Sequence, residues 1–108
     1  MSKLQLSYAA AVILQAIGNG YRYGFDVMDL VGLPSGTVYP ALRRLEAAGL
    51  VKSQWEKAEV SQREARPPRK YYDLTRAGRE ALAIAAARYR LPDPAPAAVA
   101  PKPARSRG

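Results

Sequence analysis

The sequence contains no cysteine and no histidine. Without cysteine, the chain can form neither a disulfide framework nor a thiolate metal site. Without histidine, it lacks the commonest general base, the commonest metal ligand and the side chain that titrates near neutral pH. A glycine-rich phosphate loop is missing as well. These absences exclude most enzyme chemistry, so we expect a protein that is not an enzyme and that uses no metal and no cofactor.

Long apolar runs are also missing. The uninterrupted apolar run near the N-terminus, residues 8–14, has one basic residue ahead of it and no clear cleavage signature behind it. A run of this length is at the short limit for a signal peptide and is too short to span a bilayer. The sequence therefore predicts a soluble, cytoplasmic protein with no membrane segment.

Length and composition predict one domain followed by a tail. A chain of 108 residues has room for a single domain with a modest core, and we place this domain at residues 1–90. Residues 91–108 are rich in proline and alanine and have no apolar periodicity. Such a segment buries too little apolar surface to order itself, so residues 91–108 are predicted to be a disordered tail.

The chain carries a large and uneven positive charge. Lysine and arginine number 17 against 9 acidic residues, which gives a net charge of +8. Residues 1–42 are neutral overall, whereas residues 43–90 carry +6 and residues 91–108 carry +2. A concentrated field of this sign suits phosphate binding and fast encounter with nucleic acid. A solubilising surface is the alternative explanation for a small basic protein.

Apolar periodicity and glycine stops predict four helices, at about residues 7–17, 24–31, 35–48 and 75–90. Two β-rich runs, residues 50–55 and 70–74, predict the strands of a hairpin. The segment between them is long for a hairpin loop, so we expect a helical turn at about residues 58–65. The fold class is mainly α with a small two-stranded hairpin (α+β), arranged as a winged helix-turn-helix.

The third predicted helix has an apolar inner face and a basic outer face. Its inner positions at helical spacing are Val38, Ala41, Leu42 and Leu45. Pro40 leaves two starting points open. A helix that starts at Ser35 loses one backbone hydrogen bond at Pro40, whereas a helix capped by Thr37 holds Pro40 in its first turn without that loss.

A run of residues along the third helix, the hairpin and the start of the last helix carries a specific resemblance. These residues are Tyr23, Gly24, Gly36, Thr37, Val38, Tyr39, Pro40, Ala41, Leu42, Arg43, Arg44, Leu45, Glu46, Gly49, Leu50, Val51, Arg66, Pro67, Arg69, Tyr71, Tyr72, Leu74, Thr75 and Gly78. Over residues 6–88 the chain resembles the PadR family of bacterial transcription regulators. The family usually has Ser-Pro where this chain has Pro34-Ser35. Only one short helix follows the hairpin here, as in the family's small, single-domain subgroup.

The resemblance implies a homodimeric repressor that binds a pseudo-palindromic operator in double-stranded DNA and is associated with the bacterial nucleoid. The recognition helix would enter the major groove and the basic wing would lie on the backbone. Arginine side chains suit base edges or phosphates, and hydroxyl groups suit phosphates. The expected DNA contacts are Tyr23, Ser35, Gly36, Thr37, Tyr39, Pro40, Arg43, Arg44, Arg66, Arg69 and Lys70. Arg44 has an alternative role in an ion pair with Glu46 or Glu80.

Dimerisation would then use the first and last helices. Their apolar stripes exceed what so small a core can cover, and the expected interface residues are Tyr8, Ile13, Leu82, Ala85 and Tyr89. In relatives, aromatic groups at this interface bind planar small molecules, so Tyr8 and Trp55 are the candidates for an effector site. The alternative is that Trp55 packs under the wing and Tyr8 only at the interface.

Two other functions stay open. The chain could be a winged-helix module that binds RNA, although it lacks the interleaved exposed aromatics typical of single-strand binders. It could also act mainly as a dimerisation partner of another regulator, which the basic outer face of the third helix disfavours.

Overall fold

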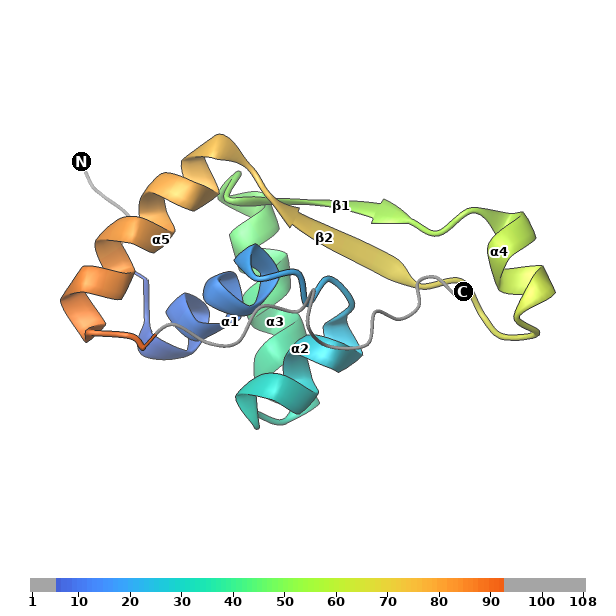
Figure 1. Ribbon diagram of the computed structural model, residues 1–108, viewed down its shortest axis with the longest axis horizontal. Coiled ribbons are helices and arrows are strands. Elements are labelled where there is room, and N and C mark those ends of the chain that lie inside the picture. Colours follow the sequence, from blue (N-terminus) through green and yellow to red (C-terminus); the bar gives the residue numbers. More distant parts are fainter. Residues whose placement is uncertain (1–5, 93–108) are drawn as a thin grey trace.

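The structure, a computed structural model, describes residues 6–92. These residues form five helices and a two-stranded hairpin (Figure 1). The elements in chain order are α1 (Tyr8–Gly18), α2 (Gly24–Val31), α3 (Ser35–Ala47), β1 (Val51–Trp55), α4 (Ala58–Arg63), β2 (Lys70–Leu74) and α5 (Arg76–Tyr89). The predicted fold class is confirmed, and the predicted bounds agree with the structure to within two residues. The helical turn expected between the strands is α4.

Helix α1 lies at the centre of the fold and contacts α2, α3, β2 and α5. The Ser7 side chain caps α1 by accepting a hydrogen bond of 3.1 Å from the Ala10 N–H. Ile13 and Leu14 are fully buried in the core. Burial of each such side chain contributes about 1.5–3 kcal/mol, so the first helix is the main source of apolar burial.

Helices α2 and α3 form the helix-turn-helix. Gly32 ends α2 with a left-handed backbone conformation (φ 73°), which permits the sharp turn into α3. At the start of α2, Gly24 lies directly against the ring of Tyr39 of α3. A Cβ atom at Gly24 would stand 2.5 Å from the Cε1 atom of Tyr39, so this close approach of the two helices requires a glycine.

The start of α3 settles the alternatives for Pro40. The Pro34 carbonyl accepts hydrogen bonds from the N–H groups of Thr37 and Val38, so the helix begins at Ser35. Pro40 therefore lies inside the helix and has no N–H to donate to the Gly36 carbonyl. Gly36 is exposed, so water can hydrate the carbonyl that Pro40 leaves without its usual partner.

The hairpin extends away from the helices and carries α4 at its far end (Figure 1). Strands β1 and β2 are antiparallel, with Ser53 opposite Tyr72 and Trp55 opposite Lys70. The segment before α2 contacts the free edge of β2 through an isolated antiparallel bridge between Tyr23 and Tyr71, and the Tyr72 N–H donates to the Arg22 carbonyl at 2.9 Å. This edge contact joins the wing to the first residues of the helix-turn-helix.

Helix α5 begins where the hairpin ends. The Thr75 hydroxyl caps α5 by accepting from the Gly78 N–H at 3.0 Å, and it donates to the Gly49 carbonyl at 2.6 Å. A Cβ atom at Gly78 would collide with the Leu50 carbonyl, so the first turn of α5 contacts the base of the hairpin directly. From there α5 packs along α1.

Candidate nucleic-acid interface

Helix α3 presents a basic outer face. Ser35, Gly36, Tyr39, Arg43 and Arg44 are exposed there, and Thr37 and Pro40 are half-buried. Within residues 6–92, neither Arg43 nor Arg44 forms an ion pair. The alternative pairing of Arg44 with Glu46 or Glu80 is therefore not present, and both guanidinium groups are available to an anionic partner.

One flank of α3 faces the wing. The Glu46 carboxylate accepts a hydrogen bond of 2.6 Å from the Ser53 hydroxyl of β1 and lies 4.0 Å from the Lys70 ammonium of β2. Tyr39 and Arg43 precede Glu46 at helical spacing, so they share this flank. Burial, together with the nearby negative charge of Glu46, raises the pKa of Tyr72 on β2 above its ordinary value. Polar groups of α3 and the wing therefore meet along one seam.

The base of the wing is built around a buried carboxylate. Glu56 is 6% exposed. Arg66 donates to its two oxygens at 2.6 and 2.9 Å, Tyr71 donates to it at 3.0 Å, and the Arg69 N–H donates at 3.3 Å. The hydrogen bonds from Arg66 outweigh the effect of burial and lower the pKa of Glu56 to about 2. Glu56 is therefore ionised throughout the physiological range.

Arg66, predicted from the sequence as a DNA contact, is bound to Glu56 in the structure. Both of its terminal nitrogens donate to Glu56, its side chain is 23% exposed, and this contact raises its pKa further. Arg66 therefore stabilises the base of the wing through its contact with Glu56. The sequence did not reveal this pair, because the two residues are ten positions apart with α4 between them, and no local spacing signals such a contact.

The same network reaches the helix-turn-helix through Tyr23. Its hydroxyl donates to the Tyr71 hydroxyl at 3.0 Å, and burial and hydrogen bonding raise the pKa of Tyr71. The guanidinium of Arg69 lies 4.7 Å from the centre of the Tyr23 ring. Arg22 forms a second link, a 2.9 Å ion pair with Asp73 of β2. These contacts fix the wing relative to the start of α2.

Of the predicted wing cations, Arg69 and Lys70 keep exposed charge. Arg69 is exposed, and its guanidinium forms no ion pair with any residue in the described range. The Lys70 side chain is 36% exposed, and its ammonium lies 5.6 Å from the centre of the Trp55 ring. Lys70 lies on the face of the hairpin that meets α3, and Arg69 lies beside Tyr23 at the start of α2.

Burial corrects the predicted dimer interface at two positions. Ile13 is 0% exposed and Ala85 is 3% exposed. Both belong to the chain's own interior and leave no surface for a partner, and Leu82 also packs against the core. The Tyr89 hydroxyl donates to the Leu6 carbonyl at 2.6 Å, and its ring meets that of Tyr8 edge-on at 5.5 Å.

The apolar side chain that α5 exposes most was not among the predicted interface residues. Ile84 is 70% exposed, and Tyr8 on α1 is 57% exposed. A helical apolar stripe shows that a face is covered but does not say whether the chain itself or a partner covers it, which explains the error at Ile13 and Ala85.

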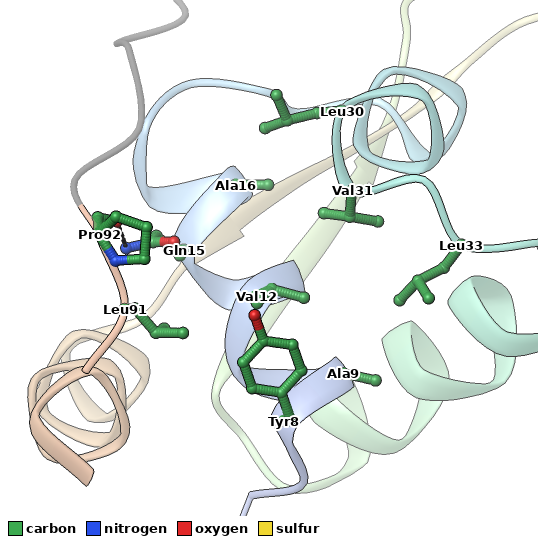
Figure 2. A pocket seen from close by; sticks show the side chains of 10 residues that line it. All are labelled: Tyr8, Ala9, Val12, Gln15, Ala16, Leu30, Val31, Leu33, Leu91 and Pro92. Atoms are coloured by element: carbon green, nitrogen blue, oxygen red, sulfur yellow. Dashed lines mark hydrogen bonds between the residues drawn. The ribbon is translucent and has the colours of Figure 1, made fainter. Parts of the chain in front are cut away.

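A pocket of about 280 Å³ lies between α1, the α2–α3 turn and the segment after α5 (Figure 2). Its walls are mostly apolar, and Gln15 closes one side by donating to the Pro92 carbonyl at 2.9 Å. Tyr8 is one of the lining residues, but Trp55 is not. The two residues predicted for one effector site are therefore in different parts of the molecule. Trp55 is 61% exposed on β1, so it does not pack under the wing either.

No helix among residues 6–92 is long and apolar enough to cross a membrane.

Comparisons with known proteins identify the family. Residues 13–84 of the chain match the family model described as "Transcriptional regulator PadR-like family". The chain is similar to a PadR family transcription regulator from Clostridium difficile R20291 (30% identity, 78% of this chain and 88% of that chain, TM-score 0.67). It is also similar to a PadR-like transcription factor from Bacteroides fragilis (26% identity, 76% and 80% coverage, TM-score 0.64).

Similarity in fold alone extends to more distantly related proteins. The structure of a protein named MarR matches with a TM-score of 0.62 at 21% identity, covering 79% of this chain and 58% of that chain. No curated protein matches the chain. The matched relatives are transcription regulators and not enzymes, which confirms the expectation from the missing catalytic side chains. The predicted resemblance is confirmed: the chain belongs to the PadR-like family of transcriptional regulators and has the family's winged-helix, DNA-binding fold.

Proposed function

We propose that the protein is a homodimeric repressor that binds a pseudo-palindromic operator in double-stranded DNA. The observation that carries this proposal is a pair of arginines, Arg43 and Arg44, on the outer face of α3 beside a basic wing. Neither forms an ion pair with any residue between positions 6 and 92. The proposed DNA contacts are Tyr23, Ser35, Gly36, Thr37, Tyr39, Pro40, Arg43, Arg44, Arg69 and Lys70. Arg66 is left out of this set because it is bound to Glu56.

The two arginines have different surroundings. Arg43 shares the wing-facing flank with Tyr39, and Arg44 lies on the opposite flank with Thr37. An arginine fork can donate two hydrogen bonds to the O6 and N7 atoms of guanine in the major groove, which is the commonest specific base contact. We assign base recognition to Arg43, because α3 and the wing together hold that flank against the DNA. Hydroxyl groups at Thr37 and Tyr39 suit phosphate oxygens.

A dimer is the natural working unit. One α3 covers one half-site, and winged-helix dimers read two half-sites about one helical turn apart. We propose that α1 and α5 form the twofold interface through the apolar side chains they expose, Tyr8 and Ile84. An isologous interface of this kind places the same surface of each copy in contact.

A gel shift tests the function directly. The protein is titrated against duplex DNA from upstream of its own gene and against RNA of equal length. Preference for the duplex supports the proposal, preference for RNA supports the RNA-binding alternative, and binding to neither supports a module that acts through another regulator. Arg43→Ala should weaken operator binding by about 1–3 kcal/mol and weaken binding to unrelated duplex much less. Equal losses on both duplexes would make Arg43 a phosphate contact.

A response to a small apolar ligand is favoured by one observation, the pocket in Figure 2. Its walls join α1 to Leu30, Val31 and Leu33 at the α2–α3 turn. A ligand there would contact both the proposed dimer helix and the helix-turn-helix, which links its binding to operator affinity. A neutral fluorescent dye, Nile red, serves as the probe. Leu30→Lys should weaken dye binding, whereas Phe25→Lys, an exposed position on α2 outside the pocket, should not.

A further inference from the structure

Trp55 is the one tryptophan in the sequence, and it lies at the far end of β1 with 61% of its surface exposed. A large aromatic ring in this position gives up most of the apolar burial that it could gain in a core. Among the described residues, its indole N–H has no hydrogen-bond partner. The fold of the single chain therefore does not explain why a tryptophan stands here.

The side of the hairpin that carries Trp55 faces α3. Side chains alternate along a strand, so Ser53 and Trp55 of β1 point to the same face. Ser53 donates to Glu46 of α3, which identifies this face as the one beside the recognition helix. The register pairs Trp55 with Lys70, whose ammonium lies 5.6 Å from the centre of the indole ring. An aromatic surface and a cation thus stand together on the inner side of the wing.

The charges around this site match a nucleic-acid backbone. When a winged helix places α3 in the major groove and the wing beside it, one sugar-phosphate strand passes between the two. Arg43 on the wing-facing flank of α3 and Lys70 on the wing supply positive charge on either side of that path. Between them, Glu46 lies 4.0 Å from the Lys70 ammonium, and a phosphate would take over that partner role. A phosphodiester strand offers phosphate oxygens to cations and to an indole N–H, and it offers apolar sugar faces to an aromatic ring.

We propose that Trp55 is a DNA contact: its ring packs on a deoxyribose of the strand that passes between α3 and the wing, and its N–H donates to a phosphate beside the one bound by Lys70. This inference rests on the proposed function, because it requires α3 to dock in the major groove. A role for Trp55 in binding a small effector is disfavoured, since the residue does not line the pocket.

The single tryptophan makes the test direct. The full chain is titrated with a mixed-sequence duplex of about 30 base pairs, long enough for two half-sites. Emission from Trp55 is excited selectively, and anisotropy of labelled DNA measures occupancy in parallel. We expect the emission to change in proportion to occupancy. Trp55→Ala should weaken binding about tenfold, which corresponds to about 1.4 kcal/mol, and Trp55→Phe should recover part of the loss.

Gln54 provides the matched control. It is the exposed neighbour of Trp55 on the opposite face of β1, so Gln54→Ala should leave DNA affinity unchanged. The double variant Gln54→Trp with Trp55→Phe moves the fluorophore to that outer face, where emission should no longer respond to DNA. Circular dichroism of each variant checks that the fold is intact.

The outcomes distinguish failure of the Trp55 contact from failure of the proposed function. If the duplex binds by anisotropy but Trp55 emission and the affinity of Trp55→Ala stay unchanged, the contact is refuted and the proposed function stands. Equal emission changes at positions 54 and 55 would also overturn the contact, because they indicate movement of the whole wing. If the unaltered chain binds no duplex at all, the proposed function itself fails.

Discussion

Replacing Glu56 with glutamine tests the network at the base of the wing. Glutamine keeps the size and shape of the side chain but removes the charge, so Arg66 loses its anionic partner. The amide NH₂ group also faces the donors of Arg66 and Tyr71, where only an acceptor satisfies them. The substitution therefore separates the electrostatic role of Glu56 from its packing.

The magnitude follows from the pKa of Glu56, which the fold lowers from 4.5 to about 2. Each pKa unit corresponds to 1.36 kcal/mol, and partial screening at the wing reduces the total, so we expect Glu56→Gln to cost about 2–3 kcal/mol at neutral pH. In a domain of this size, that loss lowers the Tm by roughly 10–20 °C.

The direction of the pKa shift also determines how the stabilisation by Glu56 depends on pH. Because the pKa of Glu56 is lowered by folding, its contribution is fully present above about pH 4.5 and is lost as the pH falls toward 2. Denaturant unfolding across this range should show the unaltered protein and Glu56→Gln converging in stability at the acid end. Glu59→Gln, an exposed carboxylate on α4, is the matched control and should change little.

Two results would refute the reasoning. No difference at neutral pH would mean that the ion pair contributes nothing to the free energy of unfolding. A difference of the same size at both ends of the pH range would mean that packing, and not the charge of Glu56, is what the substitution disturbs.

Three further predictions concern other parts of the molecule. Gly24→Ala should cost about 1–3 kcal/mol in thermal unfolding, because the new methyl group displaces the Tyr39 ring; unchanged stability would contradict the close contact. Replacing Arg69 and Lys70 with glutamine should reduce the slope of log affinity against log salt by up to about 0.9 per lost contact in each half-site, and an unchanged slope would exclude both as phosphate contacts. Ile84→Asp should convert the proposed dimer to monomer in sedimentation, and a dimer that persists would place the interface elsewhere.

The predictions for Gly24 and for the Arg69 and Lys70 pair each have a matched control. Gly36→Ala adds a methyl group to α3 where nothing beyond its chain neighbours and the helix's own backbone lies within 4 Å, so the fold should tolerate it. Arg66→Gln should destabilise the wing through Glu56 and should reduce the salt dependence less than a phosphate contact does, because its charge is already paired.

The sequence was sufficient to predict the order and type of the elements, because each depends on local signals. The bounds of α2 and β2 agree with the prediction. Gly32 marks the end of α2, and the neighbouring aromatic residues Tyr71 and Tyr72 mark β2. The start of α3 could not be decided, because Ser35 and Thr37 are both good cap residues. The structure uses neither side chain and relies on the Pro34 carbonyl.

Contacts between distant residues were the part that the sequence could not predict. Arg66 was correctly recognised as a wing residue, but its charge is satisfied by Glu56 across α4. Tyr8 and Ile13 were both predicted at the dimer interface, but Tyr8 is exposed whereas Ile13, on the same helix, is covered by the chain's own core. Whether each of the proposed DNA contacts touches the duplex stays a prediction.

The hydrogen-bond chain from Tyr23 through Tyr71 to Glu56 holds the wing at the start of α2, where Gly24 packs against Tyr39 of the recognition helix. With the wing held in this way, the wing and the recognition helix together fit one geometry of neighbouring DNA grooves. DNA that already has this geometry binds without distortion, whereas other DNA must bend or narrow a groove to bind. Because the cost of that deformation depends on base-pair stacking, sequence would be selected even at base pairs that no side chain reaches.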